Sequence, residues 1–168
     1  MSFAISQRVH QAFIALGSNL DDPASHVRQA FDELARLPSC RLLTHSALYR
    51  TAPVERLDQP DFINAVALIR TAFSPRDLLR SLLEIEHNHR RVRECRNGAR
   101  TLDLDILLYD DLLCIDTHLT LPHPRMHQRA FVLQPLCEIA PDCRLAGHGT
   151  LAELLKECAG QQLERALE

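Results

Sequence analysis

Residues 96–109 read RNGARTLDLDILLY, an arginine-containing loop that leads into an apolar strand. In this strand, predicted over residues 101–109, Asp103 and Asp105 alternate with leucine and isoleucine. Alternate residues of a strand point to opposite faces, so both carboxylates lie on one face with their Cα atoms about 6.6 to 7 Å apart. The apolar residues between them face a core. The stretch therefore predicts a sheet strand that presents two acidic groups side by side.

The acidic pair is a candidate metal site. Two carboxylates held this close repel each other unless a cation lies between them, and hard oxygen ligands suit magnesium better than zinc. A bridging pair of Mg²⁺ ions is the natural occupant. A bare Asp-x-Asp also occurs on strands whose exposed face is simply acidic, and for the pair alone that interpretation stays open.

A cluster of arginines lies just upstream of the pair. Its members are Arg90, Arg91, Arg93, Arg96 and Arg100. Taken alone, the cluster is compatible with a solvated surface run. Beside an acidic pair it favours a magnesium-bound triphosphate, because such a ligand needs both charge types in one place. The segment therefore indicates an enzyme that moves a phosphate-containing group.

Composition narrows the classes of protein. The chain has 168 residues, 46% of them hydrophobic, which suits one domain with a real core. A net charge of -3 argues against a general nucleic-acid surface. Lys156 is the only lysine, so the lysine-containing phosphate loop and the protein-kinase strand lysine are excluded. No apolar run of about 18 residues is present and the start lacks a signal-peptide pattern, so we expect a cytoplasmic protein without a membrane contact.

The order of elements predicts an α+β fold. Residues 1–10 show no period and are expected to form a flexible extension, with a single domain over 11–168. Apolar spacing and turn signals predict strands at 12–16, 42–51, 62–71 and 101–109, the last in a hairpin with 112–115, and helices from 23, over 74–89, over 127–136 and from 150. Such an order fits a sandwich of helices packed on the faces of an antiparallel or mixed sheet.

Several segments together resemble one known family. The stretch RNGARTLDLDIL at 96–107 is similar to the signature of 6-hydroxymethyl-7,8-dihydropterin pyrophosphokinases of the folate pathway. Further similar segments follow in the family's order: ALGSNL at 15–20, YRTAP at 49–53, DQPDFIN at 58–64, LPH at 121–123 and RAF at 129–131. The resemblance extends from about residue 12 to residue 139.

The resemblance implies a ferredoxin-like α+β core and a reaction. ATP and hydroxymethyldihydropterin would give AMP and the pterin diphosphate, by attack of the substrate hydroxyl on the β-phosphorus. Asp103 and Asp105 would hold two Mg²⁺ ions on the phosphates. The arginines implied in catalysis or ATP binding are Arg91, Arg93, Arg96 and Arg100, of which Arg91 and Arg93 would act on loop closure. The other ATP contacts implied are His123, Arg129 and the backbone of Ile106.

The resemblance also implies a pterin site. Phe62 and Phe131 match the family's stacking pair and Asn64 its amide, in accord with the needs of a flat polar heterocycle. Thr51, Pro53 and Val54 align with neighbouring pterin contacts. From the residues alone, both phenylalanines would be core aromatics, Asn64 a turn or surface residue, and Gly17-Ser18-Asn19 a plain strand-to-helix turn.

At some positions the residues of this chain differ from those of the best-known members of the family. Asn97 replaces a loop tryptophan, Phe62 a tyrosine, Ala52 a proline and Pro124 a tyrosine, and the arginine loop is one residue shorter. These changes bear on loop closure and affinity. A monomer is expected. Two alternative functions are a catalytically silent pterin- or nucleotide-binding relative and an RNA-binding module, of which the second would need exposed aromatics on the central strands.

Overall fold

The computed structural model of the chain describes residues 8–54, 56–90 and 99–166. The strands are β1 (His10–Ser18), β2 (Cys40–His45), β3 (Tyr49–Thr51), β4 (Phe62–Thr71), β5 (Asp103–Tyr109), β6 (Cys114–Ile115), β7 (Thr120–Leu121), β8 (Arg144–Leu145), β9 (Gly149–Thr150) and β10 (Leu163–Arg165). The helices are α1 (Pro23–Arg36), α2 (Pro75–Asn88), α3 (Ala130–Ile139) and α4 (Leu151–Glu157), with a 3₁₀ turn at Met126–Gln128.

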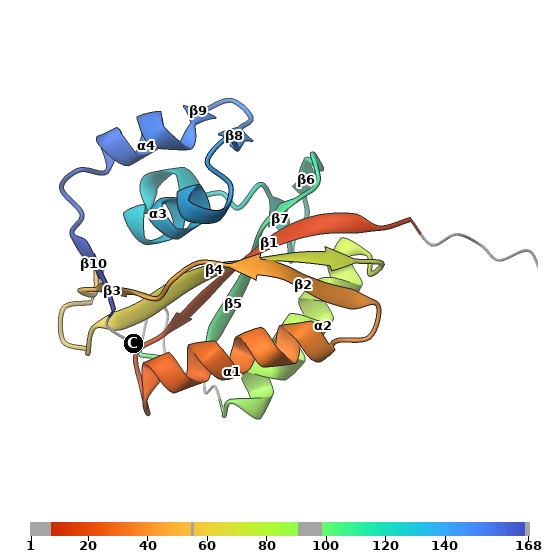
Figure 1. The fold of residues 1–168 in the computed structure, drawn as a ribbon, viewed down its shortest axis with the longest axis horizontal. Coiled ribbons are helices and arrows are strands. Elements are labelled where there is room, and N and C mark those ends of the chain that lie inside the picture. Colours follow the sequence, from red (N-terminus) through yellow and green to blue (C-terminus); the bar gives the residue numbers. More distant parts are fainter. Residues whose placement is uncertain (1–7, 55, 91–98, 167–168) are drawn as a thin grey trace, which may run out of the picture.

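An antiparallel sheet of six strands forms the centre of the fold. Its order is β10-β3-β4-β1-β5, and β2 pairs with the second half of β4. Helices α1 and α2 cover one face and α3 and α4 lie over the other (Figure 1). The predicted α+β class, with helices on the faces of an antiparallel sheet, is therefore confirmed.

The alternation of β1 builds both cores. Ala12, Ile14 and Leu16 are buried against α1 and α2, while Phe13 and Ala15 turn to the layer that contains α3. A strand covered on both faces must be apolar at every position, which explains why residues 12–16 form an uninterrupted apolar run. The central strand thereby carries its end, residues 17–19, to one rim of the sheet.

Capping residues set where the first two long helices begin. Asp22 accepts a hydrogen bond from Ser25 N, and Ser74 accepts one from Asp77 N. In both cases proline takes the first helical position, where its missing N–H costs nothing. The predicted starts at residues 23 and 74 agree with the structure to within one residue.

The helices α1 and α2 are joined by a histidine pair. Nδ1 of His26 lies 2.6 Å from Nδ1 of His89, and Nε2 of His89 lies 2.6 Å from Oε2 of Glu33. One of the two facing Nδ1 atoms must carry a proton for that contact to be a hydrogen bond.

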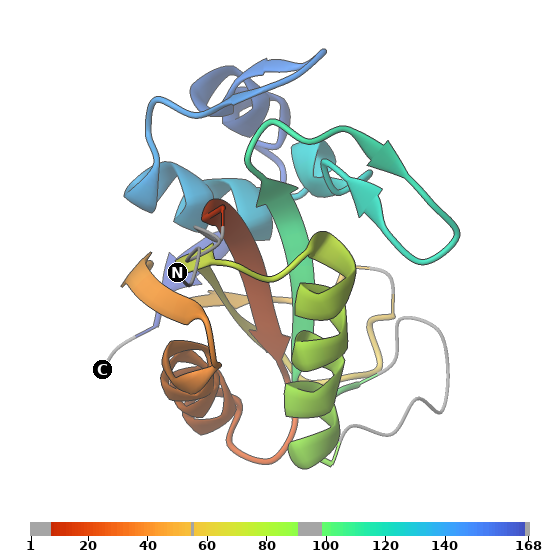
Figure 2. The same ribbon diagram turned by 90° about the vertical axis from the view of Figure 1, so that its right-hand side faces the viewer.

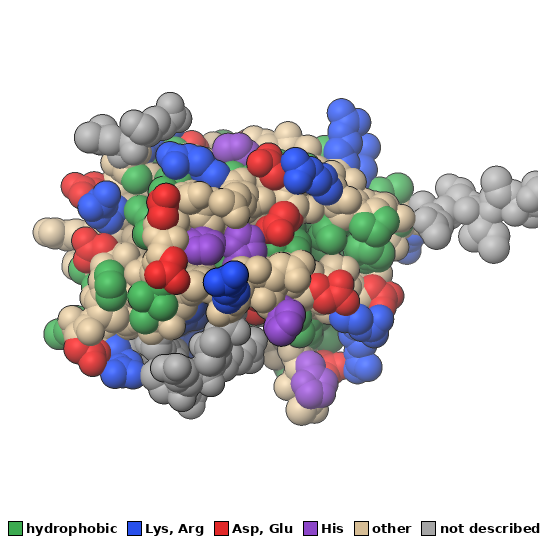
Figure 3. Space-filling view, turned by 90° about the horizontal axis from the view of Figure 1, so that it is seen from below, with side chains coloured by type: hydrophobic (Ala, Val, Ile, Leu, Met, Phe, Trp, Pro, Cys, Tyr) green, Lys and Arg blue, Asp and Glu red, His purple; other side chains and the backbone are tan. Residues whose placement is uncertain are grey.

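Figure 3 views the molecule from the side of these helices, where acidic and basic side chains are interspersed.

Two predicted elements differ from the structure. The predicted strand 42–51 is divided into β2 and β3, because Ser46 uses its backbone N–H and its side chain to bind Val66 on β4. The predicted hairpin of 101–109 with 112–115 is wrong: β6 pairs with β7 and stands away from the sheet (Figure 2). The free side of β5 is taken instead by the chain after β7, where His123 N donates to Leu107 O at 2.9 Å.

The remaining boundaries shift by a few residues. The helix predicted at 127–136 runs over Ala130–Ile139, and β1 begins at His10, inside the predicted extension, whose residues 1–7 lie outside the described ranges. The C-terminal part belongs to the sheet, since β10 pairs with β3. None of the helices described is both long and apolar enough to cross a membrane.

Candidate active site

The acidic pair lies on β5, the outer strand of the sheet. Asp103 and Asp105 are half-buried, whereas Leu104 and Ile106 are buried in the core beneath α1 and α2. Pairing with β1 places Gly17 opposite Asp103. The strand therefore buries its apolar residues and carries both carboxylates on the other face, as the alternation predicts.

Arg100 brings a positive charge to this pair. Its Nη1 donates to Oδ2 of Asp103 at 2.5 Å, and the two side chains are only 22% and 19% exposed. Charge-assisted hydrogen bonds are short and strong, and partial burial weakens screening by salt. A guanidinium cation thus contacts one of the two carboxylates expected to hold metal.

The ligand set suits a metal that arrives with a phosphate compound. Among residues 8–54, 56–90 and 99–166, no cluster of three or more histidine, cysteine, aspartate or glutamate side chains is placed to hold a metal ion. Mg²⁺ is commonly held by one or two carboxylates, with substrate phosphates and water as its other ligands. Asp103 and Asp105 fit that mode.

His123 follows β7 and is neutral near pH 7. Burial lowers its pKa to about 4, and the positive charges of Arg129 and Arg125 act in the same direction. Nδ1 accepts a hydrogen bond from Arg125 N at 3.2 Å. The single proton of the neutral ring is therefore on Nε2, which can donate to an anionic ligand.

A buried amide and a hydroxyl meet beside β1. Asn64 is 6% exposed, and its Nδ2 donates to Oγ1 of Thr51 at 2.8 Å. A Cβ atom at Gly17 would lie 3.2 Å from Oδ1 of Asn64, so a larger residue at 17 would press on this amide. Beyond β3, Pro53 is buried and Val54 is 62% exposed.

Two half-buried aromatic rings each carry an arginine over one face. Cζ of Arg100 lies 5.6 Å from the centroid of Phe62, at the start of β4. Cζ of Arg129 lies 5.5 Å from the centroid of Phe131, at the start of α3. Both distances are within the range of cation–π attraction. The structure thus joins the arginines expected at ATP to the aromatic rings expected at pterin.

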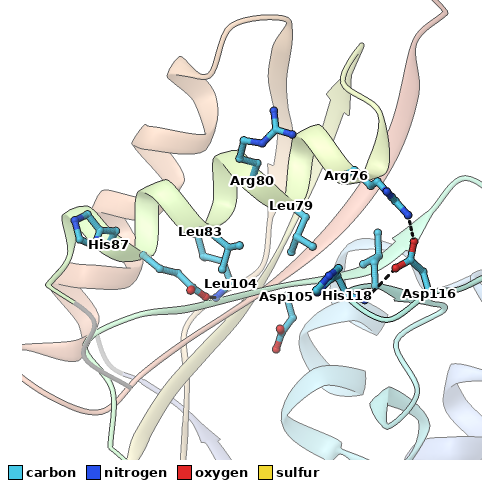
Figure 4. Close-up of a pocket in the computed structure, with 11 residues that line it drawn as sticks. Arg76, Leu79, Arg80, Leu83, His87, Leu104, Asp105, Asp116 and His118 are labelled. Atoms are coloured by element: carbon cyan, nitrogen blue, oxygen red, sulfur yellow. Dashed lines mark hydrogen bonds and ion pairs between the residues drawn. The ribbon is translucent and has the colours of Figure 1, made fainter. Parts of the chain in front are cut away.

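A cavity of about 780 Å³ opens between α2 and the chain around β5 and β7 (Figure 4). Asp105 lines it, together with the apolar side chains of Leu79, Leu83, Leu104 and Leu119. Polar residues complete the wall: Arg76, Arg80, Glu86, His87, Asp116 and His118.

Hydrogen bonds fix the walls of this cavity. Buried Glu86 accepts from Leu104 N at 2.8 Å and so ties α2 to β5. Asp116 accepts from His118 N at 3.0 Å and pairs with Arg76 of α2. These two hydrogen bonds hold the pKa of Asp116 below its ordinary value. The β6–β7 hairpin is thereby joined to α2 across the cavity.

The cavity wall contains residues that the sequence did not indicate as site residues, whereas three of the predicted site arginines lie outside the described residues. Leu79 and Leu83 were expected only as helix residues, although they form a stripe at spacing i, i+4 beside the buried stripe of α2. Leu83 is 43% exposed, which is unusual for a core leucine. Arg91, Arg93 and Arg96 lie outside the described residues.

Similarity to known proteins covers most of the chain. The family described as 7,8-dihydro-6-hydroxymethylpterin-pyrophosphokinase (HPPK) matches residues 13–141. A Pseudomonas aeruginosa protein named 2-amino-4-hydroxy-6-hydroxymethyldihydropteridine pyrophosphokinase is 45% identical over 157 residues, which are 94% of this chain and 97% of that protein. A Haemophilus influenzae protein of the same name is 45% identical over 152 residues, covering 90% and 95%.

A solved structure has a similar fold. The Plasmodium falciparum HPPK-DHPS wild type, crystallised with pterin and p-hydroxybenzoate, superposes with a TM-score of 0.71 at 15% identity. The match covers 92% of this chain and 44% of that longer chain. At this identity the likeness concerns the fold alone.

Proposed function

The chain belongs to the 7,8-dihydro-6-hydroxymethylpterin-pyrophosphokinase family, and on that premise we propose that it transfers diphosphate from ATP to 6-hydroxymethyl-7,8-dihydropterin. The products are AMP and the pterin diphosphate, an intermediate of folate biosynthesis. The observation that carries the proposal is the position of Asp103 and Asp105 on one face of β5, beside Arg100 and the cavity.

Asp103 and Asp105 would hold two Mg²⁺ ions, which when bound neutralise charge on the phosphates of ATP. The half-burial of both carboxylates supports this role, because a strand face with two adjacent acids is costly without a cation. Arg100, which contacts Asp103 at 2.5 Å, would turn to a phosphate oxygen when the metal takes its place.

ATP would occupy the cavity between α2 and β5. Leu79, Leu83 and Leu119 offer an apolar surface for the base. The backbone of Ile106, which follows the cavity residue Asp105 on β5, would contact the edge of the base. The phosphates would then extend past Asp105 towards the metals. His123 would donate from Nε2 to a phosphate oxygen, and Arg129 and Arg96 would contribute positive charge.

The pterin would lie between Phe62 and Phe131, with Asn64 at the edge of the heterocycle. The hydrogen bond from Asn64 Nδ2 to Thr51 fixes the orientation of the amide, so Oδ1 is set to accept from a pterin N–H. Pro53 and Val54 would complete this side of the site. Arg100 and Arg129 would leave the ring faces when the substrates enter.

The reaction would need no nucleophilic side chain. The substrate hydroxyl attacks the β-phosphorus in line with the leaving AMP, and the protein contributes position and charge stabilisation. Arg91 and Arg93 are proposed to add positive charge when the site closes. The domain is proposed to span residues 11–168 and to act in the cytoplasm. It is also proposed to be a monomer, and light scattering of the purified protein would test this oligomeric state.

An assay of AMP release tests the proposal. With ATP, Mg²⁺ and the pterin, the protein should form AMP and no ADP, and omission of either the pterin or Mg²⁺ should stop AMP formation. Asp103→Asn and Asp105→Asn should abolish turnover, while Asp32→Asn, which alters an exposed acid on α1, should leave it unchanged. Formation of ADP would overturn the reaction, and full activity of both variants would overturn the metal role.

A further inference from the structure

Asn19 lies at the end of β1, in the Gly17-Ser18-Asn19 segment to which the proposed chemistry assigns no task. The residue is only 2% exposed. A buried amide must satisfy its own donors and acceptor, so its partners reveal which segments it holds together. For Asn19 these partners come from two segments that are remote in the sequence.

The first partner is Arg100, which lies three residues before Asp103, the first residue of β5. Asn19 N donates to Arg100 O at 3.0 Å, and Arg100 N donates to Oδ1 of Asn19 at 2.8 Å. Asn19 thus holds both backbone polar groups of Arg100. The direction in which the Arg100 side chain leaves the backbone, towards Asp103, depends on this pair of hydrogen bonds.

The second partner is the chain that leads into β4. Nδ2 of Asn19 donates to Oε1 of Gln59 at 3.1 Å and to Pro60 O at 3.0 Å. Pro60 is two residues before Phe62, the proposed stacking residue for pterin. The same amide therefore fixes the backbone on the pterin side and the backbone on the phosphate side.

Only an amide of this length meets both requirements. Aspartate would keep the acceptor for Arg100 N but would face Gln59 Oε1 and Pro60 O with a third oxygen. Alanine would lose all three side-chain hydrogen bonds and keep only the bond from its backbone N–H to Arg100 O. The end of β1 also touches the pterin subsite through Gly17, since a Cβ atom there would lie 3.2 Å from Asn64 Oδ1.

We propose that Asn19 is a positioning residue that couples the two substrate subsites. When pterin orders the chain that leads into β4, the contacts of Asn19 also order Arg100 for the phosphates. When a nucleotide orders Arg100, the same contacts order the chain that leads into β4. The inference rests on the proposed function. Coupling of this kind is reciprocal: a nucleotide that draws Arg100 into place must tighten pterin binding by the same factor by which pterin tightens nucleotide binding.

Calorimetry tests the coupling directly. Pterin affinity is measured with and without saturating Mg²⁺ and α,β-methylene-ATP, in which a CH₂ group replaces the oxygen between the α- and β-phosphorus, so that AMP cannot leave. In the unaltered protein the nucleotide is expected to tighten pterin binding by about 5-fold or more, and in Asn19→Asp and Asn19→Ala by less than about 2-fold. Ser46→Ala is the matched control, because it removes a buried hydroxyl that joins β4 to the chain before β3. It should lower the melting temperature and keep the full coupling.

Amide hydrogen exchange separates the two halves of the contact. Asn19→Asp should keep slow exchange at the Arg100 amide, whereas Asn19→Ala should lose it. A readout without any variant remains if these proteins fail to fold: saturating pterin alone should slow exchange of the Arg100 amide in the unaltered protein.

The proposal is overturned if pterin leaves that exchange unchanged, if the unaltered protein shows no coupling, or if both Asn19 variants keep it. Failure of the proposed function is a different result, namely an unaltered protein that releases no AMP or binds no pterin.

Discussion

Acidification should destabilise this protein through His123. Burial and the nearby Arg129 and Arg125 lower the pKa of the folded residue to about 4, against 6.5 for the ordinary value. As the pH falls, the unfolded chain therefore takes up the proton first. The contribution of His123 to the free energy of unfolding is fully present above pH 6.5 and is lost as the pH falls towards 4. From these two values the loss at pH 5 is about 2 kcal/mol.

Denaturant unfolding of the unaltered protein and of His123→Asn at pH 7.5 and pH 5 measures this loss. The asparagine Oδ1 can still accept from Arg125 N, but it does not titrate. The unaltered protein should lose about 2 kcal/mol more than the variant between the two values of pH. His118→Asn, which removes an exposed histidine, should follow the unaltered protein. Equal losses for all three proteins, within about 0.5 kcal/mol, would refute the assignment.

Three other changes have definite expected outcomes. Ser74→Ala removes the cap of α2 and should lower the free energy of unfolding by about 1 kcal/mol in denaturant titrations; no change would mean that the cap is replaced by water. Leu133→Ala removes most of a fully buried side chain of α3 and should lower the free energy of unfolding by about 2 to 5 kcal/mol, whereas Leu113→Ala, at a 70% exposed position, should lower it by less than about 0.5 kcal/mol. Leu83→Glu places a negative charge in the cavity and should raise the KM for ATP about tenfold without altering the KM for pterin. The assignment of the cavity to ATP fails if the two KM values change together or not at all.

Local signals in the sequence account for the elements that were predicted well. The pairs Asp22-Pro23 and Ser74-Pro75 predict where α1 and α2 begin, because helix capping depends on residues within one turn of the helix start. The strict alternation around Asp103 likewise predicts which side of β5 is buried.

Tertiary contacts explain what could not be predicted. A turn at Asp110-Asp111 is typical of a hairpin, but Asp110 accepts from Gln11 N, and the chain at His123 occupies the other side of β5. No property of residues 110–115 alone contains this information. The division of the predicted strand 42–51 similarly depends on Val66, which is far away in the sequence.

The candidate site shows the same limit. Acidic and basic residues near each other on the chain indicated a phosphate ligand, since their chemistry is visible in a linear segment. Leu83 could not be distinguished from a core leucine until its 43% exposure placed it on the cavity wall. Asn19 appeared to be an ordinary turn residue, because its partners Arg100 and Gln59 are 81 and 40 residues away.

The fate of the β-phosphorus of ATP distinguishes the proposed diphosphate transfer from other reactions of ATP. ³¹P NMR of a reaction that contains the protein, Mg²⁺, ATP and 6-hydroxymethyl-7,8-dihydropterin can follow all three phosphorus atoms at once. Diphosphate transfer predicts that the β- and γ-phosphorus signals move together into one pterin diphosphate while the α-phosphorus appears as AMP. Appearance of ADP with transfer of the γ-phosphorus alone, or of free diphosphate without a pterin product, would contradict it.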